Sequence, residues 1–168
     1  MTSDRIEDFE RSAHAHETST VRTVADEFEQ ALSAAVVPPA VGASFPLDGI
    51  SVSMDITTEP SPEQIREAQT GVTPAGLGIA EYGTIAIQSR TAGDEPISLY
   101  PERHVAVLCA SDIVPRMSDA VEWLETEIDA GHDSVVFATG PSATGDMGAL
   151  VRGVHGPKEV HIIVVTDR

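Results

Sequence analysis

Runs of apolar residues along the chain predict the strands of a sheet. The stretches 104–110 (HVAVLCA) and 134–139 (SVVFAT) are largely apolar, which is typical of strands buried on both faces of a parallel sheet. Shorter or alternating patterns predict strands at 50–56, 77–81 and 84–88, the last two joined at Tyr82-Gly83. The run VHIIVV at 160–165 is predicted to end the sheet.

Apolar positions that recur every three or four residues predict four helices, at 20–36, 61–69, 112–130 and 144–152. Ser61 and Pro62 supply an N-cap and a first helical residue for the second of them. In the third, Met117, Val121 and Ile128 are expected to face inward. The fourth is expected to bury Met147, Leu150 and Val151.

The order of these elements predicts an α/β fold, with a mainly parallel sheet covered by helices. Its second half alternates strand, helix, strand, helix and strand with tight loops, which favours right-handed parallel crossovers. Residues 1–19 read as an acidic N-terminal tail, frayed or helical, and 20–168 as a single α/β domain. A chain of 168 residues suffices for one such domain.

The charge balance narrows the possible partners. Asp and Glu number 27 against 10 Lys and Arg, which gives a net charge of -17, and Lys158 is the sole lysine. Nucleic acids and anionic membranes are bound through clustered Lys and Arg, so neither is an expected partner. The near absence of lysine favours a halophilic protein adapted to molar salt over a merely acidic one.

The single cysteine and the length of the apolar runs bear on location. Cys109 alone cannot form an intrachain disulfide, which fits a reducing cytoplasm. The acidic N-terminus lacks the pattern of a signal peptide, and no apolar run approaches the length of about 20 residues that spans a bilayer. We therefore expect a cytoplasmic protein without membrane insertion.

Two glycine-flanked loops near the C-terminus are the main candidates for a site. GPSATGD follows the predicted strand 134–139 and begins the predicted helix 144–152, a place where ligands meet unpaired helix N–H groups outside the carboxyl ends of strands. Gly140 permits close backbone approach, and Ser142 and Thr144 offer hydroxyls. Alternatively, Thr144 merely caps the helix and Asp146 complements its dipole.

The remaining titratable candidates are two histidines and one glutamate. His155 lies between glycines in GVHGP and could be an acid–base group, a metal ligand or a solvated turn residue. His161 shares a strand face with Ile163 and is expected to be a satisfied core histidine. Their spacing fits no standard zinc site, so no metal is expected. Glu81, in the turn between two strands, could be a base, nucleophile or anchor, or face solvent.

Three ordered stretches carry a family resemblance. They are IAEYGTIAI (79–87), SLYPERHVAVLCASDIVP (98–115) and GPSATGDMGALVRGVHGPKEVHIIVV (140–165). They resemble an Ala-Glu-Thr-Gly-Thr strand pair, a Leu-Pro-Pro-x-His segment and a Gly-Pro-Ser-x-Thr-Ala-Asp-Ile-Glu … Gly-Val-His-Gly-Pro-x-x-x-His signature of the LUD domain, named for lactate utilization. The resemblance runs from about residue 71 to 165 and implies a fold like ribose-phosphate isomerase and CoA-transferases.

This resemblance implies a set of site residues. Carried over by motif, the ligand-binding residues are Glu81, Gly83, Thr84, Gly140, Ser142, Thr144, Gly153, His155 and Gly156, with His104 and His161 also at motif positions. Glu81, Asp146 and His155 are the catalytic candidates. The chain departs from the family pattern at Tyr82, Gly145, Met147-Gly148 and Glu102-Arg103, which removes an acid at position 148. We expect Glu81, Ser142 and His155 to meet at one mouth of the sheet.

The resemblance also implies a function. It is that of an accessory, non-redox subunit in the oxidation of L-lactate to pyruvate, binding a small anionic or nucleotide-like ligand beside iron–sulfur partner subunits. One cysteine cannot hold a four-cysteine cluster, so no cofactor is expected in this chain. The alternative is a stand-alone enzyme of the CoA-transferase or cyclo-ligase type that uses Glu81 or Asp146. A third hypothesis is a fold that keeps these loops for stability and binds nothing.

Overall fold

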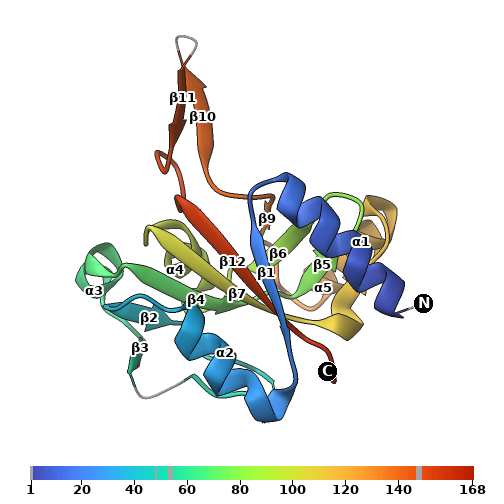
Figure 1. The fold of residues 1–168 in the computed structure, drawn as a ribbon, viewed down its shortest axis with the longest axis horizontal. Coiled ribbons are helices and arrows are strands. Elements are labelled where there is room, and N and C mark those ends of the chain that lie inside the picture. Colours follow the sequence, from blue (N-terminus) through green and yellow to red (C-terminus); the bar gives the residue numbers. More distant parts are fainter. Residues whose placement is uncertain (1, 48, 53–54, 147–148) are drawn as a thin grey trace.

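The computed structural model describes residues 2–47, 49–52, 55–146 and 149–168, with the backbone alone at 2, 145, 146, 149 and 152. A six-stranded, all-parallel sheet with the order β1-β12-β7-β4-β2-β3 forms its centre (Figure 1). Its strands are β1 (Ser19–Thr23), β2 (Ala40–Gly42), β3 (Ile56–Thr58), β4 (Thr70–Pro74), β7 (Arg103–Cys109) and β12 (Glu159–Val165). The predicted α/β class and mainly parallel sheet are confirmed.

The strands β7 and β12 lie side by side near the middle of this sheet because both are apolar on both faces. On one face, Val105 and Ile163 pack beneath helix α2 (Phe28–Ala35). On the other, Leu108 and Ile162 pack against a second sheet and helix α1 (Thr2–Ala15). The strands predicted at 104–110 and 160–165 are confirmed; β12 is the last strand along the chain but lies inside the sheet, since it pairs with β1 as well as β7.

A smaller sheet of four strands, in the order β8-β5-β6-β9, covers that second face. Its strands are β5 (Leu77–Ile79), β6 (Thr84–Gln88), β8 (Ile113–Val114) and β9 (Val135–Ala138). The strands predicted at 77–81 and 84–88 are confirmed. The prediction of a doubly buried strand at 134–139 is wrong, because β9 is the edge strand of this sheet, pairs antiparallel with β6, and leaves Phe137 37% exposed.

Helix α1 is part of the packed structure. Ile6 and Phe9 belong to the core between the two sheets, and Ala13 is fully buried. The helix predicted at 20–36 is wrong in its first part, because residues 19–23 form β1 and the α-helix begins only at Phe28. Val21 and its β-branched neighbours pair with the edge of β12, and this tertiary pairing overrides the helical spacing.

Other helices follow their sequence signals to different degrees. The predicted helix at 61–69 is confirmed as α3 (Pro62–Glu67), where Ser61 and Gln64 form a capping box. The helix predicted at 112–130 begins later, as α5 (Met117–Asp129), and Val121 and Ile128 are 59% and 53% exposed instead of facing inward. The short helix α4 (Asp94–Leu99) was not predicted.

The segment predicted as a helix at 144–152 is a β-hairpin, so that prediction is wrong. The strands β10 (Ala143–Asp146) and β11 (Ala149–Arg152) pair antiparallel and extend away from the rest of the molecule (Figure 1). Leu150 and Val151 are exposed, and Met147 lies outside the described residues. Glycine and β-branched residues in this segment favour a hairpin over a helix that would have no face to pack against.

The remaining differences between prediction and structure concern short strands. The strand predicted at 50–56 is wrong in extent, since β3 contains only Ile56–Thr58 and residues 53–54 lie outside the described part of the chain. The parallel strands β2 and β4 were missed, because Gly42, Gly71 and Pro74 weaken their sequence signal.

Across the described ranges, no helix combines the length and apolarity needed to cross a membrane.

Candidate functional site

A cavity of about 230 Å³ lies where the loop after β9 meets the loop before β12. We call it the His104 pocket. It is lined by residues 136–142 and 155–157 together with Ile87, Ser98, Leu99, His104 and Val160. Of the residues singled out from the sequence, His104, Gly140, Ser142, His155 and Gly156 are therefore brought together at one site.

The two loops are joined at Ser142. Its backbone N–H donates to the carbonyl of Pro157 (2.8 Å), and its carbonyl accepts from the N–H of Gly153 (3.0 Å). The Ser142 hydroxyl oxygen accepts a hydrogen bond from the N–H of His155 (3.3 Å). Gly156 packs so closely that a Cβ there would lie 3.3 Å from the Ser142 Cβ. These contacts fix the mouth of the pocket at the base of the hairpin.

Gly140 ties the first loop to the turn that follows α1. Its φ of +70° lies in the left-handed region, and a Cβ would lie 2.4 Å from the carbonyl oxygen of His16. Only glycine fits both constraints without distortion. The close approach predicted for Gly140 is therefore to the protein's own backbone.

His104, the second residue of β7, is the most buried polar group of the pocket. Its side chain is 2% exposed, and Nε2 lies 2.9 Å from the hydroxyl oxygen of Thr73 on β4. Burial lowers the pKa of His104 from 6.5 to about 4, so the imidazole is neutral near pH 7. No hydrogen bond to Nδ1 is present among the described residues, and His104 lines the cavity.

Glu81, Gly83 and Thr84, in and beside the turn between β5 and β6, do not line the His104 pocket. Glu81 is exposed and is not among the residues that line the pocket; its N–H donates to the carbonyl of Pro115 (3.0 Å). Gly83 has a φ of +64°, and a Cβ there would lie 2.2 Å from the nitrogen of Ala13. Thr84 is linked to the pocket indirectly, since its hydroxyl lies 2.6 Å from that of Thr139. The expected mouth is therefore formed without Glu81.

GPSATGD leads into the hairpin and not into a helix, so the helix N-terminus needed by both alternatives, an anion site or a cap by Thr144, is not formed. Thr144 lies within β10 and caps nothing. Gly153, with a φ of +72°, ends the hairpin against the side chain of Lys158. The Asp146 side chain lies outside the described part of the chain.

The position of the pocket also differs from the prediction. His104 and Val160 stand near the amino ends of β7 and β12, not at the carboxyl ends of the large sheet. The reason is that β9 belongs to the small sheet, and its carboxyl end points toward the start of these two strands. The interface between the two sheets creates the site.

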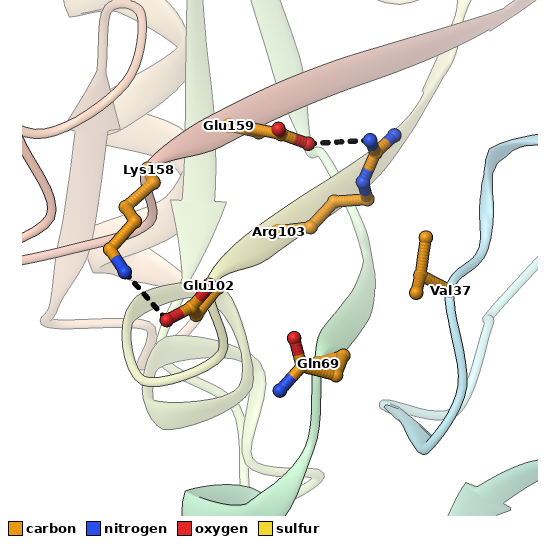
Figure 2. Close-up of a pocket in the computed structure, with 6 residues that line it drawn as sticks. All are labelled: Val37, Gln69, Glu102, Arg103, Lys158 and Glu159. Atoms are coloured by element: carbon orange, nitrogen blue, oxygen red, sulfur yellow. Dashed lines mark hydrogen bonds and ion pairs between the residues drawn. The ribbon is translucent and has the colours of Figure 1, made fainter.

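A second cavity of about 210 Å³ lies beside the same strand ends, and sequence reasoning missed it (Figure 2). Two ion pairs line it. Lys158 Nζ lies 2.6 Å from Glu102 Oε1, and an Arg103 guanidinium nitrogen lies 2.5 Å from Glu159 Oε2. Its signal in the sequence was the pair of opposite charges at the start of each of the two neighbouring strands, Glu102-Arg103 and Lys158-Glu159.

Neither His161 nor Cys109 is among the residues that line these two cavities. His161 is half-buried and its Nδ1 lies 2.7 Å from the Ser19 hydroxyl, as expected for a satisfied histidine. Its pKa is lowered by burial and by the Arg103 charge. Cys109 is a buried free thiol whose pKa burial raises to about 11. Among the described residues, no group of three or more His, Cys, Asp or Glu could hold a metal ion.

Comparison with known proteins identifies the family. The model of the LUD domain matches residues 58–165, a stretch that includes every residue lining the His104 pocket. The chain belongs to the LUD domain family. The resemblance seen in the motifs is thereby confirmed.

The LUD relatives include proteins named lactate utilization protein C. That of Geobacillus sp. (strain WCH70) is 38% identical over 106 residues, which cover 61% of this chain and 44% of the relative. That of Bacillus subtilis (strain 168) is 34% identical over 110 residues, covering 63% and 46%. The chain thus spans about half the length of the curated relatives it matches.

A solved structure supports the same fold over the whole chain. The crystal structure of a DUF162 family protein from Deinococcus radiodurans superposes with a TM-score of 0.78 at 22% sequence identity. The superposition covers 98% of each chain, so it includes α1 and the hairpin as well as the matched LUD region.

Proposed function

We propose that this LUD-domain chain is a non-redox accessory subunit in the oxidation of L-lactate to pyruvate, and that it binds a small anionic or nucleotide-like ligand in the His104 pocket. Its relatives named lactate utilization protein C support a role in lactate utilization. The single observation that carries the ligand-binding role is the pocket itself, which the two loops of the matched region build around Ser142.

Iron–sulfur lactate-utilization subunits are the proposed partners. Oxidation of lactate releases two electrons, so a complex that performs it needs a redox centre. The one cysteine of this chain is a buried, protonated thiol, which does not ligate a cluster. The redox step is therefore assigned to other subunits.

The position of Glu81 favours this role over that of a stand-alone enzyme built on the same pocket. A carboxylate that acts as a base or nucleophile must reach the bound ligand within hydrogen-bond distance. Glu81 is exposed and does not line the pocket, so it does not meet a ligand held there. His104 and Ser142 provide hydrogen bonds suited to binding.

The test is deletion of the gene followed by growth on L-lactate or on pyruvate as sole carbon source. We expect growth on L-lactate to be lost and growth on pyruvate, the product of the reaction, to be retained. Complementation with the unchanged gene is expected to restore growth, and Ser142→Ala to restore less of it at equal protein level. Normal growth of the deletion strain on L-lactate contradicts the proposal.

Affinity purification in molar KCl from lactate-grown cells tests the partners separately. We expect iron–sulfur proteins to co-purify, recognised by their visible absorption and by mass spectrometry. Recovery of the chain alone contradicts the proposed complex.

A further inference from the structure

We propose that the His104 pocket selects an uncharged, hydrogen-bonding group of its ligand, such as a carboxamide or the edge of a nucleobase-like ring, and excludes carboxylate and phosphate from its interior. This inference rests on the proposed ligand-binding role of the pocket and chooses between its two alternatives. The nucleotide-like ligand is favoured over the small anion.

The first reason is that neither lysine nor arginine is among the described residues that line the pocket, where His155 is an exposed residue. None of the described residues that line it carries an ammonium, guanidinium or carboxylate group. The two basic residues that adjoin it in sequence, Arg103 and Lys158, line the other cavity, where each is paired with a glutamate (Figure 2). An anion entering the interior beside His104 would lose its hydration without gaining a lysine or arginine partner, which is strongly unfavourable.

The second reason is the state of His104. Nε2 is held by Thr73, and Nδ1, which has no hydrogen-bond partner among the described residues, belongs to an imidazole that is neutral near pH 7. A neutral ring nitrogen offers one donor or one acceptor, according to the tautomer, but no net charge. It is therefore suited to the N–H or C=O of an amide or heterocycle. The Ser142 hydroxyl can contribute a second polar contact at the mouth.

The third reason is size and wall chemistry. Ile87, Val136 and Val160 supply aliphatic walls, and about 230 Å³ is below the range of pockets that enclose whole drug-sized ligands. The cavity therefore suits one ring or a short amide. A larger nucleotide-like ligand would keep its charged part outside, in solvent.

The experiment compares two pairs of probes that differ in little except charge: nicotinamide with nicotinate, and lactamide with L-lactate. Binding to the full chain is measured by titration calorimetry and ligand-detected NMR at pH 7 in molar KCl. We expect each amide to bind at least about tenfold more tightly than its carboxylate. Ser142→Ala is expected to weaken nicotinamide binding severalfold.

Two pocket variants locate the binding. His104→Leu is expected to abolish nicotinamide binding. Because a buried substitution can impair folding, Ala138→Leu on the half-buried rim serves as a second variant that narrows the cavity, with circular dichroism as the check on folding. If both variants fold and bind nicotinamide unchanged, the inference is overturned.

The outcomes separate this inference from the proposed function. Equal or tighter binding of nicotinate or L-lactate overturns the selection for uncharged groups and leaves the ligand-binding role intact. Binding of no probe in either pair also overturns the inference. Growth of the deletion strain on L-lactate decides the proposed function by itself.

Discussion

Acidification should destabilise this protein through His104. Burial lowers the pKa of His104 from 6.5 to about 4. Between these two values the unfolded chain binds a proton at this site and the folded chain does not. Because stability rises with pH wherever the unfolded state binds more protons, the free energy of unfolding should decrease as the pH is lowered from 6.5 toward 4.

The size of the effect follows from the two pKa values. At pH 5 the unequal proton binding lowers the free energy of unfolding by about 2 kcal/mol. Once the pH has fallen below 4, the total decrease approaches about 3 kcal/mol. His161, whose pKa is lowered by burial and by the Arg103 charge, and other ionisable groups also contribute to the pH dependence of stability. Their contribution is removed by comparing the loss of stability between pH 7 and pH 5 in the wild type with that in His104→Gln, which lacks the imidazole.

Urea denaturation followed by circular dichroism at both pH values, in molar KCl, measures the loss. We expect His104→Gln to lose about 2 kcal/mol less than the wild type on going from pH 7 to pH 5. Thr73→Val is the matched control, because it removes the hydrogen bond to Nε2 and leaves the burial that lowers the pKa. Equal pH dependence in the wild type and His104→Gln refutes the reasoning.

Two further predictions test the fold with paired substitutions measured by urea denaturation. Gly140→Ala should cost about 1 to 3 kcal/mol more than Gly131→Ala, since both glycines have positive φ but only at Gly140 would the Cβ meet backbone, 2.4 Å from the His16 carbonyl oxygen; equal losses would contradict the close contact. In α5, Ala120→Gln should cost about 1 to 3 kcal/mol because Ala120 is fully buried, and Val121→Gln less than about 0.5 kcal/mol because Val121 is 59% exposed. A larger loss for Val121→Gln would show instead that this side chain faces the core.

The elements that could be predicted were those whose signals are local and strong. The apolar run of β7, the Ser61-Pro62 start of α3 and the turn between β5 and β6 need no partner to be recognised. Elements decided by their neighbours were missed or misassigned. The hairpin at 143–152 has helical spacing but no surface to pack on, and β1 has helical spacing but the edge of β12 to pair with.

The candidate site, like the fold, could be predicted from the sequence only in part. The motifs of the sequence alone indicate the two glycine-flanked loops, with Ser142 and His155, and these loops do meet in the structure. The sequence could not show that His104 lies beside them while Glu81 does not, because that depends on the small sheet bringing the end of β9 to the start of β7. It could not show that the nearby cations are paired across the next cavity.

The sequence by itself thus determined the class of fold, the acidic surface and the loops that build the site, since composition, apolar runs and glycine motifs are properties of the chain alone. The tertiary structure decided where the pocket lies, that its buried histidine is neutral, and that no Lys, Arg, Asp or Glu is among the described residues of its wall. The physical reason is that burial, hydrogen-bond partners and ion pairs arise only when segments distant in the chain pack together.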